Sequence, residues 1–410
     1  QGAIDKRVPD PIAGALLGLV AALGLWVGLM LTAAAAFLAV KRGWASHEVA
    51  GALQQTVWLA FALSLPGMLI LWFPDPILAL STIEPAVEEK LRLYLRIIAC
   101  GMPAALLYRT FYSFCNALRQ PRPLMLISLC NTLLHGGLAW SLVSGVFTEP
   151  LGALGCGLSN AFVNWVGCGL AAGWVAKSPA LARFKPFADW QAPRWATMRE
   201  LLRLGLPMGF SNFVEITSFT LIALFVAQLG ATAVAGHRIV ANLAALCYML
   251  PLALAIATLA QVGQAAGARD WSRARHSIVA GLLLAGGLSA LLGLLLWWIA
   301  EPLTAAYTDD PGVRAVAMAL LGYVASYQFF DAVQTVSAHA LRGYRITFLP
   351  MLVHVGCFWG VGLLGGWWLA FAATPPMGAA GFWLASVCSL LLAALLLGTL
   401  LRRTLQVVER

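Results

Sequence analysis

Long apolar stretches alternate with short polar gaps along the whole chain. Each stretch reaches or exceeds the roughly 20 residues that an α-helix needs to cross the hydrocarbon core of a bilayer. The pattern therefore predicts an all-α polytopic membrane protein with eleven spanning helices. They are expected at residues 11–40, 51–73, 93–116, 123–147, 153–176, 200–228, 233–261, 277–300, 313–340, 347–372 and 379–401.

The composition agrees with lipid as the solvent for most of the chain. Of the 410 residues, 61% are hydrophobic and only 10% are charged, and the mean hydropathy is +0.83. No water-facing surface could dilute so many apolar side chains, so the composition excludes a soluble protein. All eight cysteines fall in or at the edge of apolar segments without a CxxC pair, which predicts buried free thiols and no cofactor.

The charges in the polar gaps sort by side of the membrane. Alternate gaps hold 18 Lys or Arg against 5 Asp or Glu, whereas the remaining gaps hold 6 basic against 10 acidic residues. Because cytoplasmic loops carry an excess of Lys and Arg, the first set is expected to be cytoplasmic, which places residue 1 outside. The net charge of +9 therefore needs no nucleic-acid partner. The basic gaps are 41–50, 117–122, 177–203, 262–276, 341–346 and the tail after residue 401.

Several sequence features recur at an offset of about 224 residues. Ala117-Leu118-Arg119 in one predicted cytoplasmic turn returns as Ala340-Leu341-Arg342 in another, and two pairs of glycines keep a similar spacing. Because each recurrence falls on the same side of the membrane, the two halves are expected to be parallel repeats, related by an axis along the membrane normal. The glycine pairs are Gly155 with Gly381 and Gly43 with Gly267.

The repeat also predicts a helix without a partner. Subtracting the offset from 200–228 places the first-half counterpart of that helix before residue 5. The first half is therefore expected to lack one helix of a six-plus-six arrangement, and the complete protein to have cytoplasmic termini. The gap from Lys177 to Arg199 contains three prolines and predicts the linker between the halves. The expected lobes are 1–188, with five helices, and 189–410, with six.

Two acidic residues lie well inside predicted spans, where an unpaired charge costs several kcal/mol. Glu215 and Asp331 either make interhelical pairs, with Arg109 or Arg238 as partner, or face a common cavity and bind Na+ or a proton. Two neighbouring carboxylates in a low dielectric cannot both stay ionised without such a cation, which favours the second interpretation. Tyr327 lies four residues before Asp331 and shares its helical face.

A series of motifs follows residue 200 in a fixed order. They are Leu204-Gly205-Leu206-Pro207 before Glu215, Leu229-Gly230-Ala231, Ala235-Gly236-His237, Tyr248 to Pro251, Gln261 to Gly267, Tyr327 to Asp331, and Leu341 to Tyr344. Together they resemble the multidrug and toxic compound extrusion (MATE) transporters, and specifically the NorM-like branch. The resemblance covers residues 11–402 and implies twelve helices in two lobes around a central cleft.

The resemblance also implies roles for individual residues. In the NorM-like branch a Glu in the seventh helix, an Asp in the tenth and a nearby Tyr are implicated in cation coupling, and an acidic pair lies in an outer loop. A pair of Asn in the fourth helix appears here in altered form, and the Asp of the first helix has no counterpart in this numbering. The matching residues are, in that order, Glu215, Asp331, Tyr327, Asp309, Asp310, Asn131 and His135.

These observations predict a multidrug efflux antiporter that works by alternating access and exports organic cations in exchange for Na+ or H+. Its expected partners are cationic amphiphilic small molecules and membrane lipids, and it is expected to be a monomer in a bacterial-type inner membrane. One alternative is a flippase for lipid-linked precursors of the related superfamily, which would need a basic cleft. Another is a membrane-embedded enzyme, but no catalytic or cofactor motif is visible, so the prediction is a protein that is not an enzyme.

Overall fold

The computed structural model describes residues 46–78, 85–118, 120–146 and 149–408, and all regular structure within these ranges is helical. The predicted span 11–40 and Gly43 lie outside the described residues. The chain divides into two compact units, Gln1–Gly209 and Phe210–Arg410, and the boundary falls inside one helix. The sequence placed the boundary between lobes earlier, at residues 188 and 189, in the polar linker.

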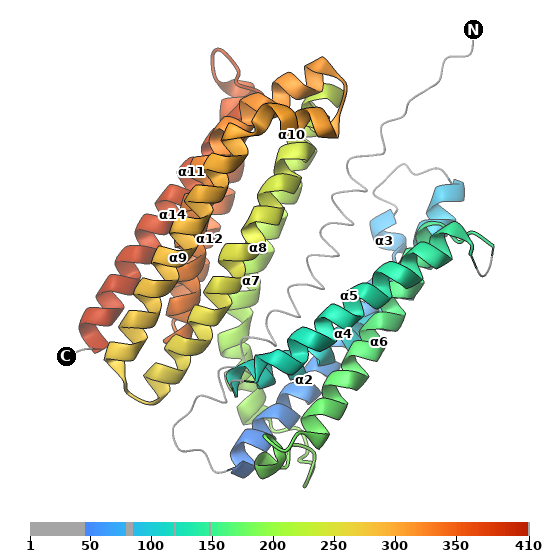
Figure 1. Ribbon diagram of the computed structural model, residues 1–410, viewed down its shortest axis with the longest axis vertical. Coiled ribbons are helices and arrows are strands. Elements are labelled where there is room, and N and C mark those ends of the chain that lie inside the picture. The colour runs from blue at the N-terminus through green and yellow to red at the C-terminus, as the bar shows by residue number, and fades with distance from the viewer. Residues whose placement is uncertain (1–45, 79–84, 119, 147–148, 409–410) are drawn as a thin grey trace. The chain divides into compact units, whose positions relative to one another are not determined.

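The first unit is a bundle of antiparallel helices (Figure 1). Within it α4 packs against α2 and α6, and α5 packs mainly against α6. Its core is built from large apolar side chains such as Leu53, Phe114 and Leu201, which are almost fully buried. Its helices are α2 (Ser46–Trp72), α3 (Asp75–Leu78), α4 (Pro85–Ala117), α5 (Pro121–Ser144), α6 (Ala153–Lys177), η1 (Ala182–Phe184) and the start of α7 (Trp195–Ala227).

The predicted linker is bound to the first unit by side chains of α2. Gln54 and Gln55 each donate to backbone carbonyls of residues 186–194 and each accept a backbone N–H from this stretch, at 2.6 to 3.2 Å. Trp58 Nε1 donates to a further carbonyl of the same stretch at 3.0 Å. Because these side chains satisfy backbone groups that no helix or strand would pair, the linker is an ordered part of this unit.

The second unit is arranged around α11, which packs against α8, α9 and α14. Most side chains from Tyr327 to Gly343 of α11 are therefore buried, and this half of the helix positions the polar groups described below. The helices are α8 (Ala231–Gly267), α9 (Trp271–Trp298), α10 (Ala300–Tyr307), α11 (Pro311–Gly343), α12 (Phe348–His354), η2 (Val355–Leu364), α13 (Gly365–Trp367), η3 (Trp368–Ala372) and α14 (Ala379–Val408).

The helix that begins as α12 widens into a π-helix at Val355. A π-turn shifts the backbone hydrogen bonds by one residue and leaves carbonyl groups open to side-chain donors. Ser218 of α7 donates to the carbonyl of Phe358 at 3.1 Å, and Ser389 of α14 donates to that of Cys357 at 2.7 Å. The widened segment is thereby tied to helices on either side of it, directly after the buried His354.

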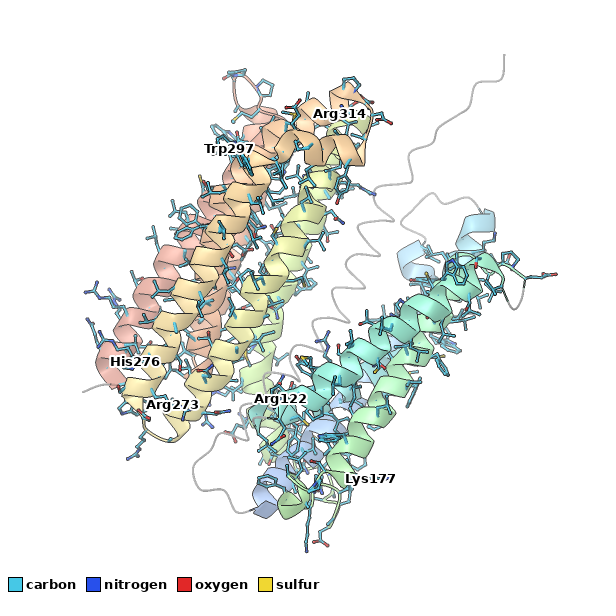
Figure 2. The ribbon with its side chains drawn as sticks, in the orientation of Figure 1. Arg122, Lys177, Arg273, His276, Trp297 and Arg314 are labelled. Atoms are coloured by element: carbon cyan, nitrogen blue, oxygen red, sulfur yellow. The ribbon has the colours of Figure 1, made fainter. Side chains whose placement is uncertain are left out.

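Ten of the eleven predicted spans fall within the described residues, and all ten are helical. Nine helices in these ranges are long and apolar enough to cross a membrane. The tenth, α6, spans 25 residues but is less apolar because it carries Ser159, Asn160 and Asn164. In Figure 2, Arg122 and Lys177, which come from two predicted cytoplasmic gaps, lie at the same end of the first unit. Arg273, from another such gap, lies at the opposite end of the second unit from Arg314.

The internal repeat is visible in the packing of two glycines. A Cβ on Gly155 would lie 2.9 Å from the backbone of Leu142, and one on Gly381 would lie 2.9 Å from the backbone of Leu369 and Ala370. Each glycine therefore lets the last helix of a hairpin approach the backbone of the preceding helix. Equivalent positions in the two halves therefore make the same close contact between helices, in agreement with the sequence offset.

The prediction of buried thiols is correct only in part. All eight cysteines are free, and Cys115, Cys168 and Cys357 are buried. It is wrong for four others, which lie on outward faces of the helices, where an apolar thiol is compatible with a surface that meets lipid. The four exposed cysteines are Cys100, Cys130, Cys156 and Cys388.

Candidate functional site

Polar side chains follow one face of α11 through its buried half. Asp331, Thr335, His339 and Arg342 are separated by four, four and three residues, the spacing that places side chains above one another on a helix. All four are buried: Asp331 is 4% exposed and Arg342 is 6% exposed. Burying such groups in a bilayer costs free energy unless they bind one another. The hydrogen-bond partners of these four side chains therefore determine what they can bind.

Gln334 connects the Asp331 carboxylate to a second helix. Its Nε2 donates to Asp331 Oδ1 and to Thr335 Oγ1, each at 2.9 Å. Its Oε1 lies 3.2 Å from His354 Nε2 at the end of α12. An amide oxygen can only accept, so His354 carries its proton on Nε2, and its buried Nδ1 has no partner among the described residues.

Arg342 lies in the last turn of α11 beside an imidazole. His339 Nδ1 is 2.8 Å from the carbonyl of Thr335, which can only accept, so this nitrogen carries the proton. The lone pair of His339 Nε2 then accepts from the Arg342 guanidinium at 3.3 Å. His339 is therefore a neutral partner, and the positive charge of Arg342 has to be balanced elsewhere.

The carboxylate of Glu215 on α7 is the anion within electrostatic range of Arg342, and it also lies near the Tyr248 hydroxyl of α8. It also repels the carboxylate of Asp331, so the two acids belong to one cluster, which we call the α11 cluster. The cluster consists of Glu215, Tyr248, Asp331, Gln334, Thr335, His339, Arg342 and His354.

Within the second unit, the cationic side chain near Glu215 differs from the one considered from the sequence. Arg238 is exposed on α8 and lies outside the α11 cluster. Arg342 fills this role, although the sequence placed it in a cytoplasmic turn. The signal that could have found it is its position eleven residues after Asp331, which is three helical turns along the same face.

Tyr327 borders the α11 cluster with an aromatic group. Its ring contacts those of Trp383 and Phe219 edge to face, with centroids 5.4 and 6.3 Å apart. Trp383 Nε1 in turn donates to His237 Nδ1 at 3.2 Å. The predicted proximity of Tyr327 to Asp331 is therefore present in the structure, one helical turn from the carboxylate and next to several ring faces.

Asp309 and Asp310 lie far from this cluster. Asp310 caps α11: its Oδ1 accepts the backbone N–H groups of Gly312 at 2.7 Å and Val313 at 3.3 Å. Asp309 is exposed and pairs with Arg314 at 3.4 Å. They precede Asp331 by about 20 residues of helix, or roughly 30 Å. The structure gives both acids local roles at the start of α11 and does not bring them to Asp331.

Asn131 and His135 form a separate polar group in the first unit. Ser159 Oγ donates to the carbonyl of His135 at 3.1 Å and lies 2.9 Å from His135 Nδ1, which therefore carries a proton. Asn131 lies against Gly167, and its buried Oδ1 has no partner in the part of the chain that the structure describes. The two residues are four positions apart on α5, which places them on one face of the helix.

Sequence reasoning missed two further amides beside this group. On α6, Asn164 Nδ2 donates to Asn160 Oδ1 at 3.0 Å; Asn160 is exposed and Asn164 is partly buried within their unit. Their spacing of four residues in an otherwise apolar helix was the signal that could have found them.

The chain is similar to known proteins over nearly its whole length. The sequence model of the MatE family matches residues 13–141 and 207–368. A relative named "Probable multidrug resistance protein NorM" from Aromatoleum aromaticum is 52% identical, with 92% of this chain and 84% of the relative covered. "Multidrug resistance protein PmpM" from Pseudomonas aeruginosa is 33% identical, with 97% and 85% covered.

Solved structures show the same fold. The crystal structure of the eukaryotic MATE transporter AtDTX14 superimposes with a TM-score of 0.82 at 16% identity, and covers 97% of this chain and 90% of that one. Members of this family are membrane transporters and not enzymes, in agreement with the absence of a catalytic motif in the sequence. The family match and the identity to NorM proteins show that this chain belongs to the MATE family and to its NorM-like branch.

Proposed function

We propose that this protein is a multidrug efflux antiporter that exports organic cations in exchange for Na+ or H+. The observation that carries the proposal is the presence of two carboxylates, Glu215 and Asp331, within electrostatic range of one another in one bundle of apolar helices. The names of the relatives, which describe multidrug resistance proteins, support the same function. The α11 cluster contains two acids and a single arginine. Because acidic side chains are in excess, the cluster favours a cation over the anionic headgroup of a lipid-linked precursor.

Competition for one negative charge would couple the two fluxes. A cation bound at Asp331 weakens binding of a second cation, and by linkage the second weakens the first by the same free energy. Oxygen atoms of Glu215, Tyr248, Asp331 and Thr335 are suitable ligands for Na+, and the carboxylates could take up H+ instead. Alternating access of the site to the two sides of the membrane then converts competition into exchange.

The aromatic group beside the cluster suits amphiphilic cations. Tyr327, Phe219 and Trp383 place ring faces next to Asp331, and a cation held over such a face gains about 0.5–2 kcal/mol. Broad apolar contact with little directional hydrogen bonding would accept substrates of different shapes. We place the protein in a bacterial-type inner membrane as a monomer.

The proposal is tested by transport in liposomes. Purified protein should move a fluorescent organic cation when an opposing Na+ or H+ gradient is imposed, and comparing the two gradients identifies the coupling ion. Glu215→Gln and Asp331→Asn should each lower the gradient-driven rate by about tenfold or more, because each removes a charge from the site. Glu301→Gln, which changes an exposed acid of α10, serves as the matched control. Unchanged transport by both cluster variants would show that neither acid couples the fluxes.

A further inference from the structure

The linker between α6 and α7 exposes large aromatic side chains. Phe187 is 37% exposed, Trp190 is 45% exposed, and Trp195, the first residue of α7, is 71% exposed. Apolar surface of this size costs free energy when it is left in water, and such patches are typical of surfaces that meet another molecule or a membrane. The exposed side chains of residues 185–199, which we call the linker surface, therefore have the character of a contact surface.

The aromatic rings of the linker surface are held in place by the first unit. Phe187 and Trp190 stack on one another, with centroids 6.4 Å apart and an interplanar angle of 5°. Phe187 also contacts Phe111 of α4, and Trp190 contacts Trp58 of α2, with centroids 6.2 and 6.3 Å apart. Because side chains of α2 bind the backbone of the same stretch, the two rings are presented by an ordered segment and not by a loose loop.

Cationic side chains lie next to these rings along the chain. Lys185, Arg194 and Arg199 are exposed, and none of them pairs with an acid in the part of the chain that the structure describes. Residues 177–199 contain five Lys or Arg and a single acid, Asp189. Trp190 Nε1 also has no acceptor among the described residues. Free cationic and indole donors beside aromatic rings suit the phosphate oxygens and the polar–apolar boundary of an anionic bilayer surface.

The flanking helices place this linker at the membrane surface. α6 ends at Lys177 and α7 begins at Trp195, at the end of the first unit that carries Lys177 (Figure 2). α7 has 33 residues, or about 50 Å, whereas the hydrocarbon core of a bilayer is about 30 Å thick. The excess length lies at its start, because Arg199, Glu200 and Arg203 all fall within the first nine residues. The first turns of α7 therefore reach the depth of the lipid headgroups.

We propose that the linker surface docks onto the membrane leaflet on the side predicted to be cytoplasmic. Its aromatic side chains lie among the headgroups, and the neighbouring cations bind the phosphates of anionic phospholipids. The inference goes beyond transport, because it assigns a lipid-binding role to the segment between the two lobes whichever ion drives exchange. Since α2 holds the linker, docking also fixes the depth of the first unit in the bilayer.

The first test titrates the purified full-length protein, in neutral detergent, with dioleoylphosphatidylglycerol and follows the midpoint of thermal unfolding. A ligand that binds the folded state raises this midpoint. We expect dioleoylphosphatidylglycerol to raise it, and dioleoylphosphatidylcholine to need about tenfold more lipid or to have no effect, because its headgroup has no net charge. Glycerol 3-phosphate, which has the charged group without acyl chains, should not raise the midpoint. If it reproduced the shift, the ligand would be a free phosphate and the proposal would be overturned.

A charge-matched pair of variants separates the linker surface from net charge. Lys185→Gln with Arg194→Gln should raise the half-saturating concentration of dioleoylphosphatidylglycerol by about tenfold or more, since each cation at an anionic surface contributes about fivefold to binding. Arg402→Gln with Arg403→Gln removes two exposed arginines near the end of α14 and should change it by less than about threefold. Equal losses in the two double variants, or no loss in the first, would overturn the proposal.

Photocrosslinking identifies what covers the exposed rings. Trp195→p-benzoylphenylalanine, irradiated in proteoliposomes that contain phosphatidylglycerol, should give phospholipid adducts by mass spectrometry. The same substitution at Leu283, a residue of α9 that is 70% exposed, is the positive control for a lipid contact. Lipid adducts at Leu283 together with only protein adducts at Trp195, from this chain or from a second copy, would make the linker surface a protein interface and overturn the proposal.

Discussion

A single amide joins a carboxylate of α11 to an imidazole at the end of α12. Gln334 uses its nitrogen for Asp331 and its oxygen for His354, and no charged side chain could serve both, because a carboxylate has no donor and an ammonium has no acceptor. The amide therefore fixes the orientation of the Asp331 carboxylate and the tautomer of His354 together. The orientation of this buried carboxylate matters because it sets the position of any cation that binds to it.

Replacing this amide should weaken both folding and binding. Gln334→Leu leaves Asp331 Oδ1 without its donor and His354 Nε2 without its acceptor, which costs about 1–3 kcal/mol for each buried group left unpaired. We expect a lower midpoint of thermal unfolding in detergent and weaker binding of tetraphenylphosphonium. Gln228→Leu, at an exposed position near the end of α7, is the control. Equal unfolding midpoints for the two variants would show that the bridge contributes nothing.

The candidate site could be predicted from sequence where a charge interrupts an apolar span. Glu215 and Asp331 can be identified for this reason, and the proximity of Tyr327 to Asp331 follows from their spacing of four residues on one helix. Arg342 does not stand out because hydropathy falls at the end of α11, so a buried arginine and one in a loop look alike in the sequence. The carboxylate within electrostatic range of Arg342 lies on α7, more than 100 residues away in the sequence, and no local pattern encodes such proximity.

At the scale of helices, the two halves use glycine to bring neighbouring backbones together. Gly155 of α6 faces the backbone of α5, and Gly381 of α14 faces that of η3, each with room for a hydrogen atom and not for a methyl group. Close contact of this kind increases packing between helices in lipid, where water provides no hydrophobic force between them.

Adding one methyl group at these glycines should be destabilising in both halves. Gly155→Ala and Gly381→Ala place a Cβ against backbone atoms that cannot rotate away, at a cost of about 1–3 kcal/mol. Gly173→Ala in α6 and Gly398→Ala in α14 have open space around the new carbon and should be neutral or stabilising by about 0.5–1 kcal/mol. Thermal unfolding in detergent would compare them, and equal midpoints within each pair would contradict the repeat-packing argument.

The helices themselves were predictable, but their ends were less so. Hydropathy detects only the apolar part of a helix, and α4 begins at Pro85 where the apolar stretch begins at residue 93, because its first two turns carry charges. α8 continues to Gly267, six residues past the predicted span, through a stretch of small residues and one Gln. The short α3 lies wholly in a polar gap, as does α10 apart from its first residue, and neither has an apolar signal of its own.

At the scale of the molecule, each unit combines a helical bundle with one polar group in its interior or on its helix faces. In the second unit this is the α11 cluster, and in the first it is the group around Asn131 and His135. The group in the first unit consists of an amide and an imidazole, whereas the α11 cluster contains two carboxylic acids. The two halves therefore share a helical architecture but contain different polar side chains. The sequence predicts the shared architecture better than it predicts the difference between the two polar groups.

Competition of two monovalent cations for the α11 cluster determines how the membrane potential acts on exchange. When one monovalent cation replaces another at a shared site, no net charge crosses the membrane, so the roughly 2.3 kcal/mol per charge available at 100 mV neither drives nor opposes transport. We expect protein-dependent uptake of tetraphenylphosphonium against H+ or Na+, after subtraction of the uptake by protein-free liposomes, to proceed at the same initial rate whether the potential is clamped at zero or, with valinomycin and a K+ gradient, at about 100 mV. A rate that rises or falls with the clamped voltage would mean that unequal numbers of charges are exchanged per cycle. Equal rates would mean that the transporter draws its energy from the concentration gradient of the coupling ion alone, and that the electrical part of the cell's ion-motive force is left for other proteins.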